Sequence, residues 1–169
     1  MRITAVEEYG LRCLLNLARK GRGSQMSISE IADLEGLSTP YASKLLSILR
    51  KAGLVEAERG RTGGFSIARD PEQINLHEVL SALGGPLLDP DHCTKFSGQL
   101  DKCVHLDYCS VQEVLGGLAG YIQSFLMGTS LKEIIDGGPL KFNRQREESA
   151  MLAGSALTGE LNKVEENKS

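Results

Sequence analysis

The chain has 169 residues, of which 41% are hydrophobic, enough for one modest core or two small ones. Because no apolar run reaches about eighteen residues and the N-terminus lacks the features of a signal peptide, we expect a cytoplasmic protein that has no membrane partner. The net charge of -3 is distributed unevenly. Residues 1–75 hold 11 Lys and Arg and 9 Asp and Glu, whereas residues 76–169 hold 8 Lys and Arg and 13 Asp and Glu. This distribution suits a DNA-binding half followed by a half with another role.

Three helices are predicted in the first third of the chain, and in the first and third of them apolar residues recur at helical spacing. Residues 5–20 form the first helix. Ser27 and Glu30 form a capping box that begins a short helix over "ISEIADLE", and Gly36 ends it. Ser38 caps the third helix. The buried stripe of that third helix is predicted to consist of Ala42, Leu45, Leu46, Leu49 and Ala52.

The second and third helices, joined by a tight turn that contains a glycine, are typical of a helix-turn-helix. In that motif the N-terminal half of the second helix contacts base edges in the major groove. Five residues of this helix point away from the buried stripe and are predicted to contact DNA: Thr39, Tyr41, Ser43, Lys44 and Ser47. Taken alone, the same positions also fit an ordinary solvated helix face.

The segment "LVEAERGRTGGFSIAR" predicts a strand, a turn and a second strand. Gly60, Gly63 and Gly64 are expected to supply the unusual backbone angles of the turn. Arg59 and Arg61 at the tip are placed to contact phosphates or a narrow minor groove. A basic hairpin directly after a helix-turn-helix is a wing. The sequence therefore predicts a mainly α winged helix-turn-helix domain with a small β-hairpin, which spans residues 1–75.

The segment "HCTKFSGQLDKCVHLDYC" gathers three of the four cysteines, Cys93, Cys103 and Cys109. In a reducing compartment, clustered thiols bind metal more often than they form disulfides. A capping box of Ser110 and Glu113 predicts a helix just after Cys109, whose N-terminal end stabilises an anionic ligand. An iron–sulfur cluster fits these thiols. Zinc with His92 or His105 as a further ligand, and a metal-free thiol/disulfide switch, remain alternatives.

A long amphipathic helix is predicted over residues 110–127. Its apolar residues are Val111, Val114, Leu115, Leu118, Ile122, Phe125 and Leu126. The core of a single small domain does not need a helix this apolar to close it. We therefore expect the helix to pack against the same helix of a second copy in a homodimer. Gly116 and Gly120 would allow another backbone to approach closely. A two-fold dimer also presents two recognition helices to two DNA half-sites.

The remaining segments are predicted more briefly. Residues 76–136 form the cysteine loop and dimerisation helix, with a short capped helix at 130–135, and residues 137–169 form a mostly flexible tail. Cys13 lies on the apolar face of the first helix and is expected in the core. His77, in a short helix capped by Asn75, is expected at the surface.

Three stretches resemble the IscR/NsrR/RsrR-type regulators: "MRITAVEEYGLRCLLNLA", "LSTPYASKLLSILRKAGLVEAERGRTGGFSIAR" and the loop that ends in Cys103 and Cys109. The resemblance covers residues 1 to about 135 and is most specific in the wing motif and the cysteine loop. Members are homodimeric winged-helix transcription factors. Many of them carry an iron–sulfur cluster that senses iron, redox state or nitric oxide.

The resemblance implies that Cys93, Cys103 and Cys109 are the three cysteine ligands of such a cluster. The fourth ligand varies among members. In some it is an acidic residue of the other subunit, a position that Glu8 holds here, and His105 or His92 is next in line. The cluster is either 2Fe–2S or 4Fe–4S, since four ligands satisfy both types. A double-stranded DNA operator is the implied partner.

No nucleotide motif and no paired acid and base indicate an enzyme, so we expect none. An iron–sulfur redox or electron-transfer protein is the alternative from another class. Such a protein would have no need of a wing. The sequence thus favours a homodimeric DNA-binding regulator controlled by an iron–sulfur cluster.

Overall fold

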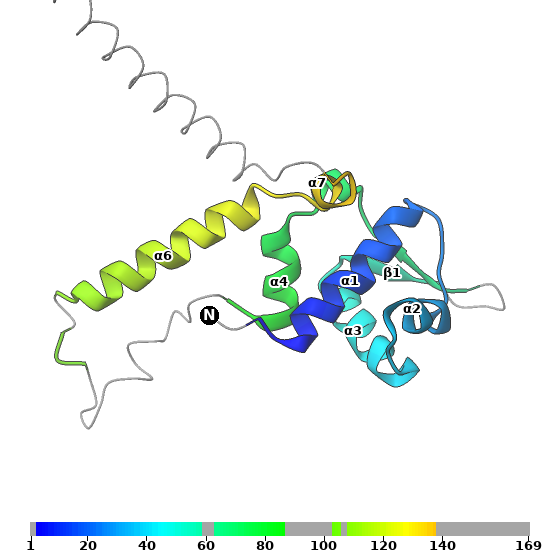
Figure 1. Ribbon diagram of the computed structural model, residues 1–169, viewed down its shortest axis with the longest axis horizontal. Helices are drawn as coiled ribbons and strands as arrows, with labels where there is room; N and C mark the ends of the chain where they lie inside the picture. Colours follow the sequence, from blue (N-terminus) through cyan, green and yellow to red (C-terminus); the bar gives the residue numbers. More distant parts are fainter. Residues whose placement is uncertain (1–2, 59–62, 87–102, 106–107, 138–169) are drawn as a thin grey trace, which may run out of the picture.

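The computed structural model describes residues 3–58, 63–86, 103–105 and 108–137 of the chain. This part is mainly α-helical with one two-stranded antiparallel hairpin, so the predicted fold class is confirmed (Figure 1). The elements in chain order are α1 (Ala5–Lys20), α2 (Ile28–Glu35), α3 (Thr39–Lys51), β1 (Val55–Ala57), β2 (Phe65–Ile67), a short 3-10 helix η1 (Pro71–Gln73), α4 (Leu76–Gly84), α6 (Ser110–Met127) and α7 (Leu131–Ile135).

Local capping interactions set the ends of the helix-turn-helix. The Ser27 hydroxyl accepts a hydrogen bond from the Glu30 backbone N–H, and the Glu30 carboxylate accepts one from the Ser27 N–H, which confirms the predicted capping box. Gly36 ends α2 in the left-handed region, with φ 64°. Ser38 caps α3 as predicted. The prediction is wrong for Ala52, because this residue is the exposed C-cap of α3 and lies outside its buried stripe.

The core is built around α1, which contacts α2, α3, α4, α7 and β2. Cys13, Leu14 and Leu17 of α1 are fully buried, as are the predicted stripe residues of α3 apart from Ala52. Burial raises the pKa of the Cys13 thiol to about 11, and the nearby Glu35 carboxylate adds to the effect. Cys13 is therefore a neutral core residue, as predicted.

The hairpin forms where it was predicted and gains a third backbone segment. β1 and β2 pair antiparallel, with Val55 opposite Ile67. The backbones of Met26 and Phe65 exchange hydrogen bonds of 2.9 and 2.8 Å, which fix the segment before α2 to the edge of β2. A Cβ on Gly64 would lie 2.7 Å from the Met26 carbonyl oxygen, and the φ of Gly64 lies outside the left-handed region. This close approach, and not the predicted unusual backbone angle, accounts for the glycine.

The helices α4 and α7 complete the same core. The Leu76 backbone N–H donates to the Thr129 carbonyl and the Leu131 N–H donates to the Ile74 carbonyl, both at 2.9 Å. Apolar side chains of α4 and α7 belong to one hydrophobic cluster with those of α1 and α3. The predicted division at residue 75 stays a prediction. The tail predicted from residue 137 lies, from residue 138 on, outside the described residues.

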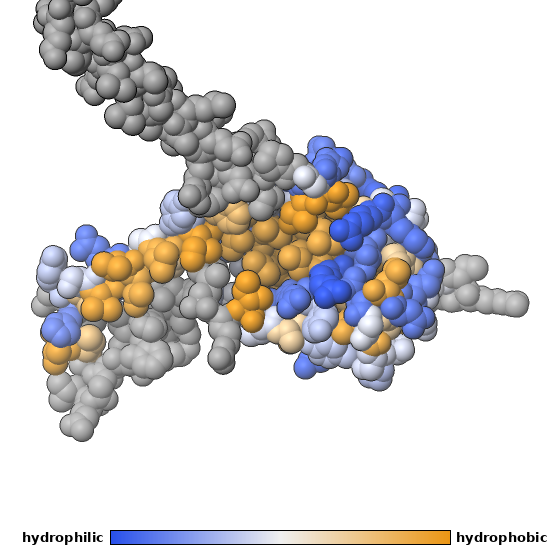
Figure 2. All heavy atoms as spheres, viewed as in Figure 1, coloured by the Kyte–Doolittle hydropathy of each residue, from blue (hydrophilic) through white to orange (hydrophobic). Residues whose placement is uncertain are grey.

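The helix α6 extends away from this core, as Figure 1 shows. Leu126 near its C-terminal end is buried, whereas most of its other apolar side chains are exposed and form a band of hydrophobic surface along the helix (Figure 2). The exposed residues are Val111, Val114, Leu115, Leu118, Tyr121 and Met127. The helix predicted over residues 110–127 is thus confirmed. Among the described residues, no helix combines the length and apolar character that a membrane span requires.

Candidate functional site

The residues predicted to read DNA all lie on α3, and none of them is buried in the core: Thr39, Tyr41, Ser43, Lys44 and Ser47. Lys44 is exposed, and its neighbour Ser43 is partly buried. Tyr41 differs from the others because its ring packs edge-on against the ring of Tyr9 on α1, with the centroids 6.3 Å apart. Tyr41 therefore holds α3 against α1, whatever it contributes to a DNA contact.

The predicted wing is described at its base but not at its tip. Arg59 and Arg61 lie outside the described residues. At the base, the Glu58 backbone N–H donates to the Gly64 carbonyl at 3.0 Å and continues the hairpin beyond its strands. Glu58 also accepts a hydrogen bond from the side chain of Gln25. The described part of the hairpin thus carries a carboxylate near the tip, and its predicted attraction for phosphates depends on the two arginines.

The thiols of Cys103 and Cys109 are free and partly buried. Cys109 directly precedes α6, whereas Cys103 lies earlier in the chain, in the short described stretch 103–105. Cys109 is the N-cap of α6, since its Sγ accepts a hydrogen bond from the backbone N–H of Gln112 at 3.4 Å. The predicted capping box of Ser110 with Glu113 is wrong, because Ser110 is already the first residue of the helix. The N-terminal end of a helix stabilises a negative charge, so the position of Cys109 suits a thiolate ligand.

The other predicted ligands are distributed differently. Cys93 and His92 lie outside the described residues, and His105 is exposed. Glu8 projects from α1 with 61% of its side chain exposed, 3.8 Å from the guanidinium of Arg12. Figure 1 shows α1 well apart from the N-terminal end of α6. Within one chain, the described residues contain no group of three or more His, Cys, Asp or Glu side chains that could hold a metal ion.

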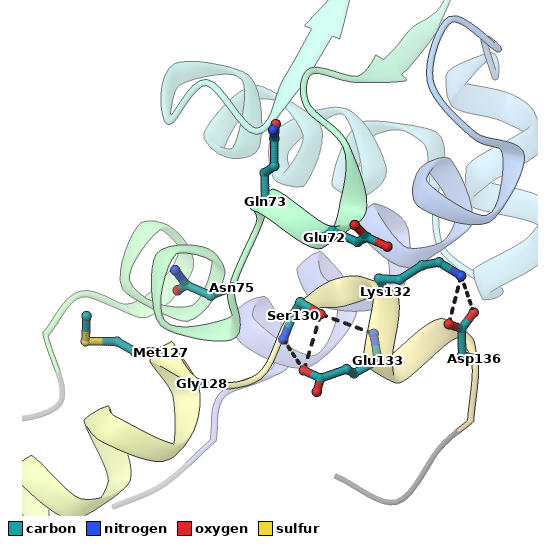
Figure 3. Close-up of a pocket in the computed structure, with 9 residues that line it drawn as sticks. All are labelled: Glu72, Gln73, Asn75, Met127, Gly128, Ser130, Lys132, Glu133 and Asp136. Atoms are coloured by element: carbon teal, nitrogen blue, oxygen red, sulfur yellow. Dashed lines mark hydrogen bonds and ion pairs between the residues drawn. The ribbon is translucent and has the colours of Figure 1, made fainter. Parts of the chain in front are cut away.

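A polar cavity of about 490 Å³ lies where η1, α4 and α7 meet (Figure 3). Its lining residues are Glu72, Gln73, Asn75, Met127, Gly128, Ser130, Lys132, Glu133 and Asp136. The Ser130 backbone N–H donates to the Glu133 carboxylate at 2.9 Å, and the Lys132 amine lies 2.7 Å from the Asp136 carboxylate. These contacts cap and support α7. Of the predicted DNA and metal ligands that the structure describes, none lines this cavity.

A second hollow of about 400 Å³ lies between α1, α4 and α6, and most of its lining side chains are apolar. Glu7 and His77 lie at its wall. His77 is therefore partly buried, where a surface position was predicted.

Sequence reasoning missed two features near the predicted site. One is the pairing of Met26 with Phe65, which adds a third segment to the wing. The other is the position of Arg12 beside Glu8 and Glu35. The contact between Glu8 and Arg12 could have been predicted, because the two residues are four positions apart on a predicted helix. Nothing in the sequence pattern links Arg12 to Glu35 on another helix.

Comparisons with known proteins agree with this geometry. The profile of the Rrf2 family, described as "Iron-dependent Transcriptional regulator", matches residues 3–137. The transcriptional regulator NsrR of Shouchella clausii is 33% identical over 124 residues, which cover 73% of this chain and 81% of that protein. The regulator IscR of Xenorhabdus nematophila is 32% identical over 135 residues, which cover 80% of this chain and 79% of that protein.

Two solved structures are similar over most of their length. T. potens IscR has a TM-score of 0.64 and 26% identity, covering 81% of this chain and 88% of that chain. CymR, the global cysteine regulator of B. subtilis, has a TM-score of 0.65 and 26% identity, covering 82% of this chain and 99% of that chain. The resemblance noted from the sequence is confirmed.

Proposed function

This chain belongs to the Rrf2 family of transcriptional regulators, and we propose that it binds a double-stranded DNA operator as a homodimer whose affinity is controlled by an iron–sulfur cluster. The proposed ligands are Cys93, Cys103 and Cys109 of one subunit and Glu8 of the other. The observation that carries the proposal is the position of Cys103 and Cys109. Both thiols are free, and Cys109 caps an exposed apolar helix that Cys103 precedes in the chain. The same chain holds a helix-turn-helix with a hairpin.

The exposed face of α6 supports the homodimer. Gly116, Gly117 and Gly120 each lower helix propensity by about 1 kcal/mol, so α6 depends on packing for its stability. Within the described residues, nothing lies within 4 Å of a Cβ placed on any of the three, which leaves room for another backbone. A second copy offers the same apolar face, and a two-fold contact covers both faces at once.

The same two-fold arrangement supports operator binding. It presents two α3 helices to major-groove sites about 34–36 Å apart. In this proposal Ser43 and Ser47 are short side chains that contact base edges, whereas Lys44 contacts a phosphate. Arg59 and Arg61 contact phosphates or the minor groove on either side.

The described thiols fit an iron–sulfur cluster by their chemistry. Such clusters are held mainly by Cys thiolates, and Cys103 and Cys109 are both free. Cys109 also lies at a helix N-terminus, where a negative charge is stabilised. When bound, the cluster supplies an iron centre that responds to oxidants and nitric oxide.

The position of Glu8 suggests how ligation reaches DNA. Glu8 lies on α1, the central helix of the DNA-binding core, whereas Cys109 is the N-cap of α6 and Cys103 precedes that helix in the chain. Ligation by Glu8 of the partner subunit ties the core of one subunit to the dimerisation helix of the other. Its release lets the two cores rotate, and only one spacing fits two half-sites. A preference of about 1–3 kcal/mol between the two arrangements changes DNA affinity about 5- to 150-fold.

A cysteine-based regulator without such a cluster is the second candidate. The likeness to Staphylococcus aureus CymR, whose structure was also solved in an oxidized form, favours it. In that case the same thiols form a disulfide switch or bind zinc, with His105 as an exposed neighbouring ligand. An electron-transfer protein is less well supported, since it leaves the helix-turn-helix without a role.

The experiment that separates these functions is operator binding by the full chain with and without its cluster. We expect Cys103→Ala to purify without iron and to bind DNA with no response to oxidant or nitric oxide. Glu8→Ala should retain a more weakly held cluster with an altered spectrum and a smaller response. Asp33→Ala, which removes an exposed carboxylate from α2, is the control and should respond like the wild type. Equal affinity of the wild-type protein with and without its cluster would contradict the proposal.

A further inference from the structure

We propose that Gln25 and Glu58 are a positioning pair, which holds the wing at a fixed orientation to the helix-turn-helix and thereby favours operator DNA over unrelated DNA. The side-chain amide of Gln25 donates a hydrogen bond to the carboxylate of Glu58. Gln25 lies in the segment before α2, and Glu58 directly follows β1 at the base of the wing. The inference rests on the proposed operator binding and is independent of the iron–sulfur cluster.

The wing depends on contacts outside its own hairpin. β1 and β2 have three residues each, and a two-stranded hairpin is by itself only marginally stable in water. On the returning strand, Phe65 exchanges two backbone hydrogen bonds with Met26. On the outgoing side, the Glu58 backbone N–H donates to the Gly64 carbonyl, a bond within the hairpin that does not set its orientation to α2. The side-chain contact with Gln25 joins this outgoing side to the segment before α2.

Gln25 contacts both sides of the wing base. Its side-chain amide reaches Glu58 on the outgoing side. On the returning side, its Cβ lies 3.3 Å from the position that a Cβ on Gly64 would take, so the glycine lets Gln25 lie close to the hairpin backbone. Gln25 precedes Ser27, the N-cap of α2, by two residues. The pair therefore links the base of the wing to the start of the helix-turn-helix.

A fixed wing matters more for sequence selection than for attraction to DNA in general. Non-specific binding depends on charge attraction between basic side chains and phosphates, and it tolerates many orientations. Operator binding requires α3 in the major groove while Arg59 and Arg61 contact phosphates or the minor groove. A wing that is already held in place loses less conformational freedom when both contacts form together. The hydrogen bond should therefore raise the ratio of operator affinity to non-specific affinity.

The first test needs no DNA and follows the hydrogen exchange of backbone amides in the full chain by NMR. We expect Gln25→Ala to speed exchange of the Glu58 amide, which is bonded to the Gly64 carbonyl, about fivefold. The Ala68 amide, bonded to the Leu54 carbonyl at the opposite end of the hairpin, is the internal control and should exchange as in the wild type. An unchanged rate at Glu58 overturns the proposal.

The second test measures DNA selection. The operator probe is a duplex that the wild-type full chain selects from random sequence, and the non-specific probe is a scrambled duplex of the same length. Gln25→Ala and Glu58→Ala should each lower the ratio of the two affinities about fivefold or more. The double variant should lower it no further, because both changes remove the same contact. Glu56→Ala, which removes an exposed carboxylate from β1, is the control and should keep the wild-type ratio.

Glu58→Gln separates the hydrogen bond from the charge. The new side chain keeps an oxygen that accepts from Gln25 but carries no charge, so this variant should keep a ratio close to that of the wild type. Its affinity for both duplexes should rise by the same factor, because a carboxylate near the wing repels phosphates. A ratio as low as that of Glu58→Ala would show that the charge and not the hydrogen bond sets the selection, and the proposal would be wrong.

The outcomes distinguish this inference from the proposed function. A wild-type ratio in Gln25→Ala, or additive losses in the double variant, overturns the role of the pair and leaves operator binding standing. A wild-type protein that selects no sequence contradicts operator binding and with it the role of the pair in selection. The exchange rate of the Glu58 amide then decides separately whether Gln25 holds the wing.

Discussion

Dimerisation through α6 is tested most sharply at Leu118, because this residue lies in the middle of the exposed apolar face. In the single chain 55% of Leu118 is exposed, so its replacement removes little from the core of the subunit itself. Leu118→Glu places a carboxylate where two copies are proposed to meet. We expect this variant to be a folded monomer at concentrations where the wild-type protein is a dimer.

The magnitude follows from the exposed area. Full burial of a leucine side chain contributes about 1.5–3 kcal/mol, so the exposed half of Leu118 accounts for about 1 kcal/mol on each subunit and about 2 kcal/mol per dimer. Leu118→Ala should therefore raise the dimer Kd about 30-fold. Leu118→Glu should raise it further, since a buried carboxylate without a partner adds an unfavourable free energy.

The assay is sedimentation velocity over a range of protein concentrations, with thermal unfolding followed by circular dichroism as the check on folding. Gln123→Glu is the matched control, because it adds the same charge to an exposed position about 140° around the helix from Leu118. The control should dimerise like the wild type. A Leu118→Glu variant with the wild-type Kd, or equal weakening by Gln123→Glu, would refute the assignment of this face.

Three further predictions concern the wing, its base and the core. Arg61→Ala should weaken binding to all DNA sequences about equally and lower the slope of log affinity against log salt by about one, measured by fluorescence anisotropy; an unchanged slope would remove the wing contact. Gly64→Ala should lower the free energy of unfolding in urea by about 1–3 kcal/mol, because the new Cβ would lie 2.7 Å from the Met26 carbonyl oxygen. A variant with wild-type stability would show that the backbone adjusts to the extra methyl group at no measurable cost. Because the folded protein raises the pKa of Cys13 from 9.0 to about 11, the unfolded chain loses this proton first, and the free energy of unfolding should fall as the pH rises from 9 to 11. Cys13→Ala should flatten that fall, and an identical pH dependence in urea titrations would contradict the burial effect.

The parts of the fold that were predicted well depend on short-range interactions. The periodicity of apolar residues placed α1, α3 and α6, since only one face of each pattern can be buried. The caps Ser27 and Ser38 were readable because their bonds span three residues. Cys109 was missed as the cap of α6, since a serine directly after it matched the usual pattern better than a thiol.

The interactions that were not predicted join residues far apart in the sequence. The pairing of Met26 with Phe65 crosses the whole helix-turn-helix, and the ion pair of Arg12 with Glu35 joins two helices whose packing the pattern does not specify. The ligands of the candidate metal site are likewise far apart in the sequence. Glu8 and Cys109 lie on elements that the single chain keeps apart, so its proposed completion depends on a second copy.

An iron–sulfur cluster in this regulator is tested most directly by the iron content, acid-labile sulfide content and visible spectrum of the full chain purified without oxygen. We expect coloured wild-type protein in which iron and sulfide are present in similar amounts, and colourless Cys103→Ala protein that contains neither. Colourless wild-type protein, with stoichiometric zinc or with no metal, would contradict the iron–sulfur regulator.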